Sequence, residues 1–244
     1  MPQLNVIAGP NGSGKSTLIS KLLAEGIALG EYLNADDIAA NLTGPPDEIA
    51  REAQQIVRDR RIAALREGRD HSFETVMSHV SHIDYMHEAR LAGFEVRLFF
   101  VATEDPVINL GRVDNRVTHG GHGVPADRVV ARYHRSIGNL PAAMLASDQC
   151  RIFDNSSADR PLRRLADAIR FGEILWLEHD WNMWDSLEAL KAITLATWPN
   201  VELAPNELGL NEWIAEACAR MPVWWLEILL QLRPNAPFED GPLP

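Results

Sequence analysis

Cysteine is scarce in this sequence, which has only Cys150 and Cys218 among its 244 residues. Two cysteines so far apart do not make the disulfide framework of a small secreted domain. Long apolar runs are missing as well: the longest, 223–232, is interrupted by Glu227 and is too short to span a membrane. The first residues lack the basic and apolar segments of a signal peptide. These absences predict a cytoplasmic protein with reduced thiols and no membrane contact.

Positive charge is also in short supply, since 23 lysines and arginines stand against 34 acidic residues, a formal net charge of −11. Non-specific binding to nucleic acid depends on neutralising phosphates, so this balance predicts no nucleic-acid partner. The deficit of positive charge is not evenly distributed along the chain. From Phe171 onward, twelve acidic residues accompany three basic ones, a net of −9, and the preceding residues carry the other −2. The acidity therefore belongs to the C-terminal part of the chain.

A glycine-rich stretch near the N-terminus, IAGPNGSGKSTL, matches the pattern G-x-x-x-x-G-K-[ST]. In this pattern backbone N–H groups turn inward around phosphate oxygens and the lysine reaches the outer phosphates. An apolar strand pattern precedes it at 3–8 and helical spacing follows at 16–24, so the stretch leads into a helix N-terminus, which favours anions. We predict a nucleoside triphosphate site formed by Gly9, Pro10, Asn11, Gly12, Ser13, Gly14, Lys15, Ser16 and Thr17.

Strand and helix patterns alternate along the chain. Alternation of this kind predicts an α/β fold with a mainly parallel sheet and helices on both faces. The segment 158–176 fits either one helix or a hairpin turning at Gly172, and we favour the hairpin. We predict a P-loop kinase domain over 1–172 and an acidic, tryptophan-rich, mostly helical extension over 173–244. The predicted strands are 3–8, 31–34, 71–74, 94–102 and 150–154, and the predicted helices are 15–25, 46–67, 77–92, 105–118, 125–137 and 139–147.

Polar side chains follow three of the predicted strands, where ligands of parallel sheets bind. Asp36 could accept a proton from an acceptor hydroxyl or hold Mg²⁺ together with Ser16. Alternatively, Asp36 or its neighbour Asp37 could cap the turn that follows. Glu74 could contact a substrate or simply favour a helix N-terminus. The strand-end pairs are Asp36 and Asp37, Glu74 and Thr75, and Asp154 and Asn155.

Arginines recur at helical spacing between residues 112 and 135. Each set lies along one helical stripe, where like charges cost a few tenths of a kcal/mol unless an anion faces them. An arginine that reaches the γ-phosphate accelerates phosphoryl transfer, and the glycines around 120–123 would let such a segment close as a lid. The alternative is a solvated helix face. The two sets are Arg112 with Arg116, and Arg128 with Arg132 and Arg135.

The histidines of this region, His119, His122 and His134, have no acid or cysteine at metal-ligand spacing. We expect them to serve lid polarity or substrate hydrogen bonding. A triphosphate site by itself does not separate a motor, a switch and a kinase. The long strand pattern VRLFFVATED reaches its acids only after Ala102 and Thr103, which is a poor match to the metal-binding strand of motor proteins.

An ordered set of motifs, GPNGSGKST, NADDIA, FET, AGFEVRLFFV, GGHGVP, RYHRS and FDNS, resembles the zeta-toxin family of P-loop kinases in its compact zeta-like branch. The resemblance covers residues 3–157. It implies ATP-dependent phosphorylation of a UDP-activated amino sugar, typically UDP-N-acetylglucosamine, with ATP and Mg²⁺ as cofactors. The GGHGVP turn differs from the founding toxins, so the acceptor could differ.

The resemblance also implies roles for individual residues. Lys15 and Ser16 would bind ATP and Mg²⁺, and Asp36 would be the base. The sugar nucleotide would meet Glu74 and Thr75, and the transferred phosphate would meet Arg116 with Arg128 or Arg132. Independently of the resemblance, we predict that Arg112 and His122 also contact the substrate. The rivals are a P-loop kinase for a nucleic-acid 5′-end or an antibiotic, and a nucleotide-dependent switch without an acceptor.

Toxins of this family are restrained by antitoxins that cover the ATP site. We therefore hypothesise that the acidic extension 173–244 docks on the arginines or on a partner protein, whereas the alternative is an extra helical layer over the core.

Overall fold

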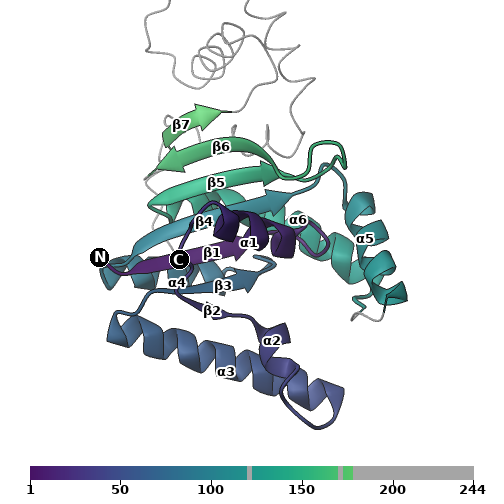
Figure 1. Cartoon of the computed structure of the whole chain (residues 1–244), viewed down its shortest axis with the longest axis horizontal. Helices are drawn as coiled ribbons and strands as arrows, with labels where there is room; N and C mark the ends of the chain where they lie inside the picture. Colours follow the sequence, from purple (N-terminus) through teal and green to yellow (C-terminus); the bar gives the residue numbers. More distant parts are fainter. Residues whose placement is uncertain (120–122, 170–172, 178–244) are drawn as a thin grey trace, which may run out of the picture. The chain divides into compact units, whose positions relative to one another are not determined.

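A computed structural model describes residues 1–119, 123–169 and 173–177, with side chains placed up to residue 165. Its centre is a seven-stranded sheet in the order β2-β3-β1-β4-β5-β6-β7 (Figure 1). The pairs among the first five strands are parallel, and β5 pairs with β6 in the antiparallel sense. The strands are β1 (Gln3–Ala8), β2 (Glu31–Leu33), β3 (His71–Thr75), β4 (Glu95–Ala102), β5 (Gln149–Asp154), β6 (Arg163–Ile169) and β7 (Glu173–Leu177).

Helices cover both faces of the sheet, as the sequence predicts. On one face Ile7, Phe99 and Phe153 pack with Leu18 and Leu22 of α1. The alternate strand residues, such as Val6, Leu98 and Ile152, are also buried and lie under α4 and α6 on the opposite face (Figure 1). The helices are α1 (Lys15–Ala24), α2 (Ala35–Ala39), α3 (Pro46–Glu67), α4 (Ser81–Leu91), α5 (Pro106–Thr118) and α6 (Ala126–Leu145).

The strand register brings the carboxyl ends of the parallel strands to one edge. Ala8 pairs with Thr75 across β1 and β3, and Ala102 pairs with Asp154 across β4 and β5. The loop after β1 therefore begins beside the polar ends of its neighbours, which is the usual position of a ligand in such sheets.

Two predicted helices differ from the structure. Helices predicted at 125–137 and 139–147 are one helix, α6, and Pro141 lies inside it. A proline removes one helical hydrogen bond, but Pro141 is buried together with Leu140 and Met144, so packing holds the helix together. Residues 77–80 are not helical, because Met77 has a φ of 56° and its N–H donates to Thr75 Oγ1 at 2.9 Å.

The segment 158–176 forms strands β6 and β7 on either side of Gly172, so the hairpin prediction is confirmed for the strands. The sequence indicates only a capped turn at Ile38, whereas the structure has the short helix α2 there. The chain divides into two units, Met1–Leu175 and Trp176–Pro244. Of the predicted helical extension 173–244, residues 173–177 form the strand β7, and 178–244 lie outside the described residues. No helix in the described ranges is long and apolar enough to cross a membrane.

Candidate nucleotide-binding site

The glycine-rich loop connects β1 to the first turn of α1, as the motif predicts. Gly14 is the N-cap of α1 in a left-handed conformation with a φ of 102°. The first N–H groups of a helix have no intrahelical acceptor, so they are available to an anion together with the positive end of the helix dipole. Ser13 adds a buried hydroxyl that has no hydrogen-bond partner among the described residues. These donors suit the phosphates of a nucleotide.

Three glycines of the loop stand where a side chain would not fit. A Cβ on Gly9 would lie 2.0 Å from the carbonyl oxygen of Val101, and one on Gly12 would lie 2.6 Å from that of Asn109. A Cβ on Gly14 would lie 2.2 Å from Asn155 Nδ2. The glycines therefore let the loop pack closely against the ends of β4 and β5 and the start of α5.

Two asparagines hold the loop from behind. Asn155 Nδ2 donates to the Ser13 carbonyl at 2.8 Å, and Asn109 Nδ2 donates to the Asn11 carbonyl at 2.6 Å. Asn109 in turn accepts a short hydrogen bond from the buried hydroxyl of Thr103. The loop is thus fixed by side chains from β5 and α5 before any ligand binds.

Lys15 is buried at the floor of the loop. Its Nζ donates to the carbonyl oxygens of Gly9 and Pro10 at 3.0 and 3.1 Å, and it lies 3.7 Å from Glu74 Oε1. Burial lowers the pKa of Lys15, and the negative charge of Glu74 partly opposes this. The ammonium group occupies the place from which it can meet the outer phosphates of a nucleotide.

The carboxylates come from the ends of β2 and β3. Asn34 is the N-cap of α2 and accepts from the N–H of Asp36 at 2.9 Å. The capping role suggested for Asp36 or Asp37 therefore falls to Asn34. Asn34 has the extended backbone that is typical of an N-cap residue. The Asp36 carboxylate stays available to a ligand.

Glu74 is held between two partners. It faces Lys15 on one side and accepts a hydrogen bond from the Tyr32 hydroxyl at 3.1 Å on the other. Burial and the negative charge of Glu74 raise the pKa of Tyr32. The Thr75 hydroxyl accepts a hydrogen bond from the N–H of Met77. Both residues predicted to contact substrate thus lie at the strand end, and their substrate roles remain predictions.

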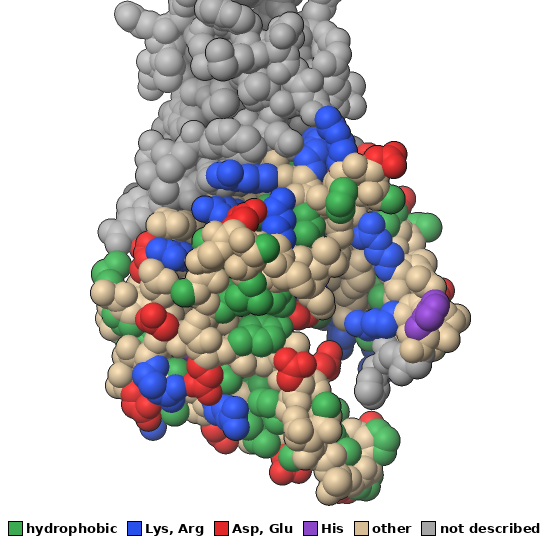
Figure 2. All heavy atoms as spheres, in the orientation of Figure 1, with side chains coloured by type: hydrophobic (Ala, Val, Ile, Leu, Met, Phe, Trp, Pro, Cys, Tyr) green, Lys and Arg blue, Asp and Glu red, His purple; other side chains and the backbone are tan. Residues whose placement is uncertain are grey.

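A cavity of about 420 Å³ lies at this edge of the sheet. Figure 2 shows a hollow here, with acidic side chains along one rim and basic side chains along the other. Lys15 and the carboxylates of Asp36 and Glu74 line it, and Arg116 of α5 and Arg132 of α6 reach it from the opposite side. A hydroxyl group placed between these residues would have carboxylates on one side and positive charges on the other.

Other predicted residues lie elsewhere. The guanidinium of Arg112 donates to the Asn155 carbonyl at 2.8 Å, behind the loop, and does not line the cavity. Arg128 is exposed and also does not line it. His122 lies outside the described residues. Ser16 is exposed in the first turn of α1, and its hydroxyl, with the carboxylate of Asp36, is an oxygen donor set of the kind Mg²⁺ prefers.

No cluster of three or more histidine, cysteine or acidic residues suited to a metal occurs among the described residues. Nucleotide-bound Mg²⁺ is usually held by one or two carboxylates together with substrate phosphates and waters. Asp105, one of the acids after β4, accepts from the N–H of Val107 as the N-cap of α5.

Several residues of the site were missed from the sequence. Gln54, Val57 and Arg61 of α3 and His82 of α4 line the cavity. They stand far from the loop in sequence and carry no motif, so only the packing of α3 and α4 beside β3 brings them there. The signal was weak: arginines at one face of the predicted helix 46–67.

The sequence model of the family described as "AAA domain" matches residues 4–140, which is more than half of the chain. A protein of Haemophilus influenzae described as uncharacterized is 32% identical over 130 residues, which cover 51% of this chain and 88% of that protein.

Solved structures are similar at the level of the fold. A chain of the AvrRxo1-ORF1:-ORF2 complex with ATP matches with 17% identity and a TM-score of 0.55, covering 96% of this chain and 81% of that one. The same complex with sulphate ions matches with 16% identity and a TM-score of 0.55, with the same coverage. The likeness supports the P-loop fold that the sheet order shows.

Proposed function

This chain belongs to the AAA domain family, and we propose that it is an ATP-dependent kinase that phosphorylates a hydroxyl of a UDP-activated amino sugar such as UDP-N-acetylglucosamine. The observation that carries the proposal is the cavity at the strand ends, where Lys15 and Asp36 face Arg116 and Arg132. A switch needs the phosphate loop, but it does not need a carboxylate opposite two arginines. The zeta-toxin resemblance of the motifs supports the choice of acceptor.

In the proposed reaction the acceptor hydroxyl attacks the γ-phosphorus of ATP. A new bond forms between phosphorus and the acceptor oxygen, and the bond to the bridging oxygen of ADP breaks. Asp36 takes the hydroxyl proton. Mg²⁺, when bound with ATP, neutralises charge on the phosphate oxygens.

The remaining groups hold the transferred phosphate. Lys15 and the loop N–H groups bind the phosphates of ATP, while Arg116 and Arg132 stabilise charge on the equatorial oxygens. Glu74 keeps Lys15 in place through their 3.7 Å contact.

The test incubates the protein with ATP, Mg²⁺ and a panel of acceptors, and measures mass. A gain of about 80 Da on a UDP-sugar supports the proposal. If the gain occurs on a nucleic-acid 5′-end or an antibiotic, that molecule is the acceptor and the UDP-sugar is not. ATP binding without transfer to any acceptor would favour a switch.

Asp36→Asn gives a second, sharper result. If Asp36 is the base, this variant loses transfer and keeps its affinity for ATP. Asp37→Asn, on the neighbouring residue that does not line the cavity, is the matched control and keeps both.

We also propose that the acidic extension 173–244, or a separate antitoxin, restrains the kinase. The support is the opposite charge of the extension and the arginines of α5 and α6. The comparison is ATP turnover by the full chain and by a shortened chain that retains β7. Equal rates from two folded proteins would rule out restraint by the extension.

A further inference from the structure

A second and larger cavity lies between α3 and α4. Its volume is about 760 Å³, within the range of small-molecule sites. It shares Gln54, Val57, Arg61 and His82 with the cavity at the strand ends, so the two cavities have a common wall. A molecule whose reacting end sits near Asp36 could extend past this wall.

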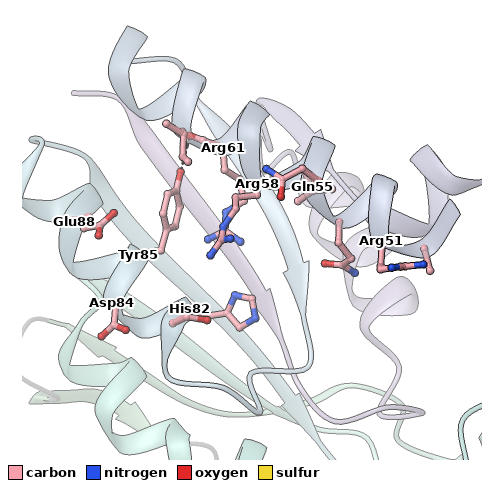
Figure 3. Close-up of a pocket in the computed structure, with 13 residues that line it drawn as sticks. Arg51, Gln55, Arg58, Arg61, His82, Asp84, Tyr85 and Glu88 are labelled. Carbon is pink, nitrogen blue, oxygen red and sulfur yellow. Dashed lines mark hydrogen bonds between the residues drawn. The ribbon is translucent and has the colours of Figure 1, made fainter. Parts of the chain in front are cut away.

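Three arginines on one side of α3 line the larger cavity: Arg51, Arg58 and Arg61. Figure 3 shows Arg58 and Arg61 reaching from α3 toward His82. Within the described part of the chain, neither arginine has a carboxylate at salt-bridge distance. Asp84 and Glu88 line the α4 side, so three positive charges face two negative ones.

Arg58 and Arg61 are three residues apart on the same helix, and like charges at that spacing repel. Burial lowers the pKa of Arg61, and the positive charge of Arg58 adds to this effect, while Tyr85 and Glu88 oppose it. A bound anion would offset both the repulsion and the burial of the charge.

Arg61 is also prepared for a ligand by its surroundings. Its guanidinium lies over the rings of Phe73 and Tyr85, 4.1 and 4.0 Å from their centroids. This stacking fixes the plane of the guanidinium, which suits paired hydrogen bonds to phosphate oxygens.

Two buried nitrogens at the common wall have no hydrogen-bond partner among the described residues: Arg61 Nε and His82 Nδ1. A buried polar group without a partner lowers stability, so a polar ligand that bonds to it is favoured.

We propose that the α3–α4 cavity binds a phosphate-bearing end of the acceptor, with Arg58, Arg61 and His82 as its contacts. The inference rests on the proposed function, since it assigns the acceptor's hydroxyl to Asp36 and its phosphate or diphosphate group to the larger cavity. Such a subsite makes the enzyme selective for acceptors that carry phosphate at a distance from the reacting hydroxyl. An uncharged sugar would leave the arginines unneutralised.

The test uses inorganic pyrophosphate as the probe. The full chain is first saturated with the non-hydrolysable analogue AMP-PNP and Mg²⁺, which fills the phosphate loop, and pyrophosphate is then titrated by calorimetry. Arg58→Gln removes one contact on an exposed side chain, so folding is preserved. Arg66→Gln is the control, because Arg66 is exposed on the same helix and lines neither cavity.

We expect saturable binding in the native protein, at least roughly tenfold weaker binding in Arg58→Gln, and no change in Arg66→Gln. Arg61→Lys, which keeps the charge and removes Nε, should also weaken binding. No saturable binding by the native protein, or equal weakening in Arg58→Gln and Arg66→Gln, overturns the proposal.

The outcome is separate from that of the proposed function. A chain that binds pyrophosphate through Arg58 but leaves UDP-N-acetylglucosamine unmodified has the subsite and a different acceptor. A chain that phosphorylates UDP-N-acetylglucosamine equally well in Arg58→Gln and Arg66→Gln has the activity without this subsite.

Discussion

The phosphate loop and the arginine-bearing helices α5 and α6 face one cavity but are built in opposite ways. The loop is packed against backbone at Gly9 and Gly12 and is held by Asn109 and Asn155. Arg116, by contrast, is exposed at the end of α5. The loop is held in shape by the protein alone, whereas the arginines, under the proposed function, act on a bound phosphate. Packing thus determines one side of the site and charge determines the other.

Lys15→Ala should have the largest effect, because it removes a buried charge from the preformed side. We expect phosphoryl transfer to fall by about 10³-fold or more. Lys21→Ala is the control on the same helix, since Lys21 does not line the cavity; it donates to the Leu162 carbonyl at 3.4 Å and lies over the Phe153 ring. Initial rates with saturating acceptor measure the effect. A similar rate loss in both variants would point to a damaged helix.

Arg132→Ala tests the side determined by charge. We expect the rate to fall by about 10²- to 10³-fold while the thermal midpoint changes little. Arg128→Ala, one turn earlier on α6 and outside the cavity, should keep nearly the native rate. If Arg128→Ala lost more activity than Arg132→Ala, we would assign the phosphate contact to Arg128. Single-turnover rates with ATP and Mg²⁺ distinguish the two arginines.

Gly9→Ala tests how far packing determines the loop. A Cβ there would lie 2.0 Å from the Val101 carbonyl oxygen, so we expect the free energy of unfolding to fall by roughly 3 kcal/mol. Gly26→Ala is matched, because Gly26 also has a positive φ but no atom within 4 Å of its Cβ position. Its cost should stay near ~1 kcal/mol. Denaturant unfolding of both variants gives the difference; equal costs would show that the loop can relax.

The smallest expected effect concerns His82 on the wall of the cavity. Burial lowers its pKa to about 4 from the usual value of 6.5. Between these values the unfolded chain binds more protons than the folded one, so stability falls as the pH drops from 6.5 toward 4. The difference between the two pKa values corresponds to at most about 3 kcal/mol, and solvent screening of the partly exposed ring reduces the loss. Unfolding of His82→Gln should show a weaker pH dependence than that of His79→Gln, an exposed control; identical curves would show that His82 does not titrate this way.

Much of the fold could be predicted from the sequence because local patterns determine it. The strand 3–8 and the helix 46–67 have the predicted bounds, since a regular apolar pattern and a proline at the helix start leave little choice. Pro141 misled the helix prediction, because buried packing outweighs the missing hydrogen bond. Local patterns do not report such long-range support.

The candidate site could be predicted only where the chain itself brings residues to the strand ends. Lys15, Asp36 and Glu74 follow strands and line the cavity together. Asn109 was not predicted, because its contact with the loop comes from a distant helix. Arg61 was not predicted either, because its place depends on how α3 lies beside β3.

Leu162 connects the segment between β5 and β6 to the edge of the sheet where the glycine-rich loop lies. Its N–H donates to Asn155 Oδ1 at 3.1 Å, and its carbonyl oxygen accepts from Lys21 at 3.4 Å. The asparagine that steadies the loop thus also anchors the segment that leads into β6. A shortened protein must keep this anchor, because a cut before residue 162 would weaken the support of the loop, and the resulting loss of activity would hide any gain from removing a regulator.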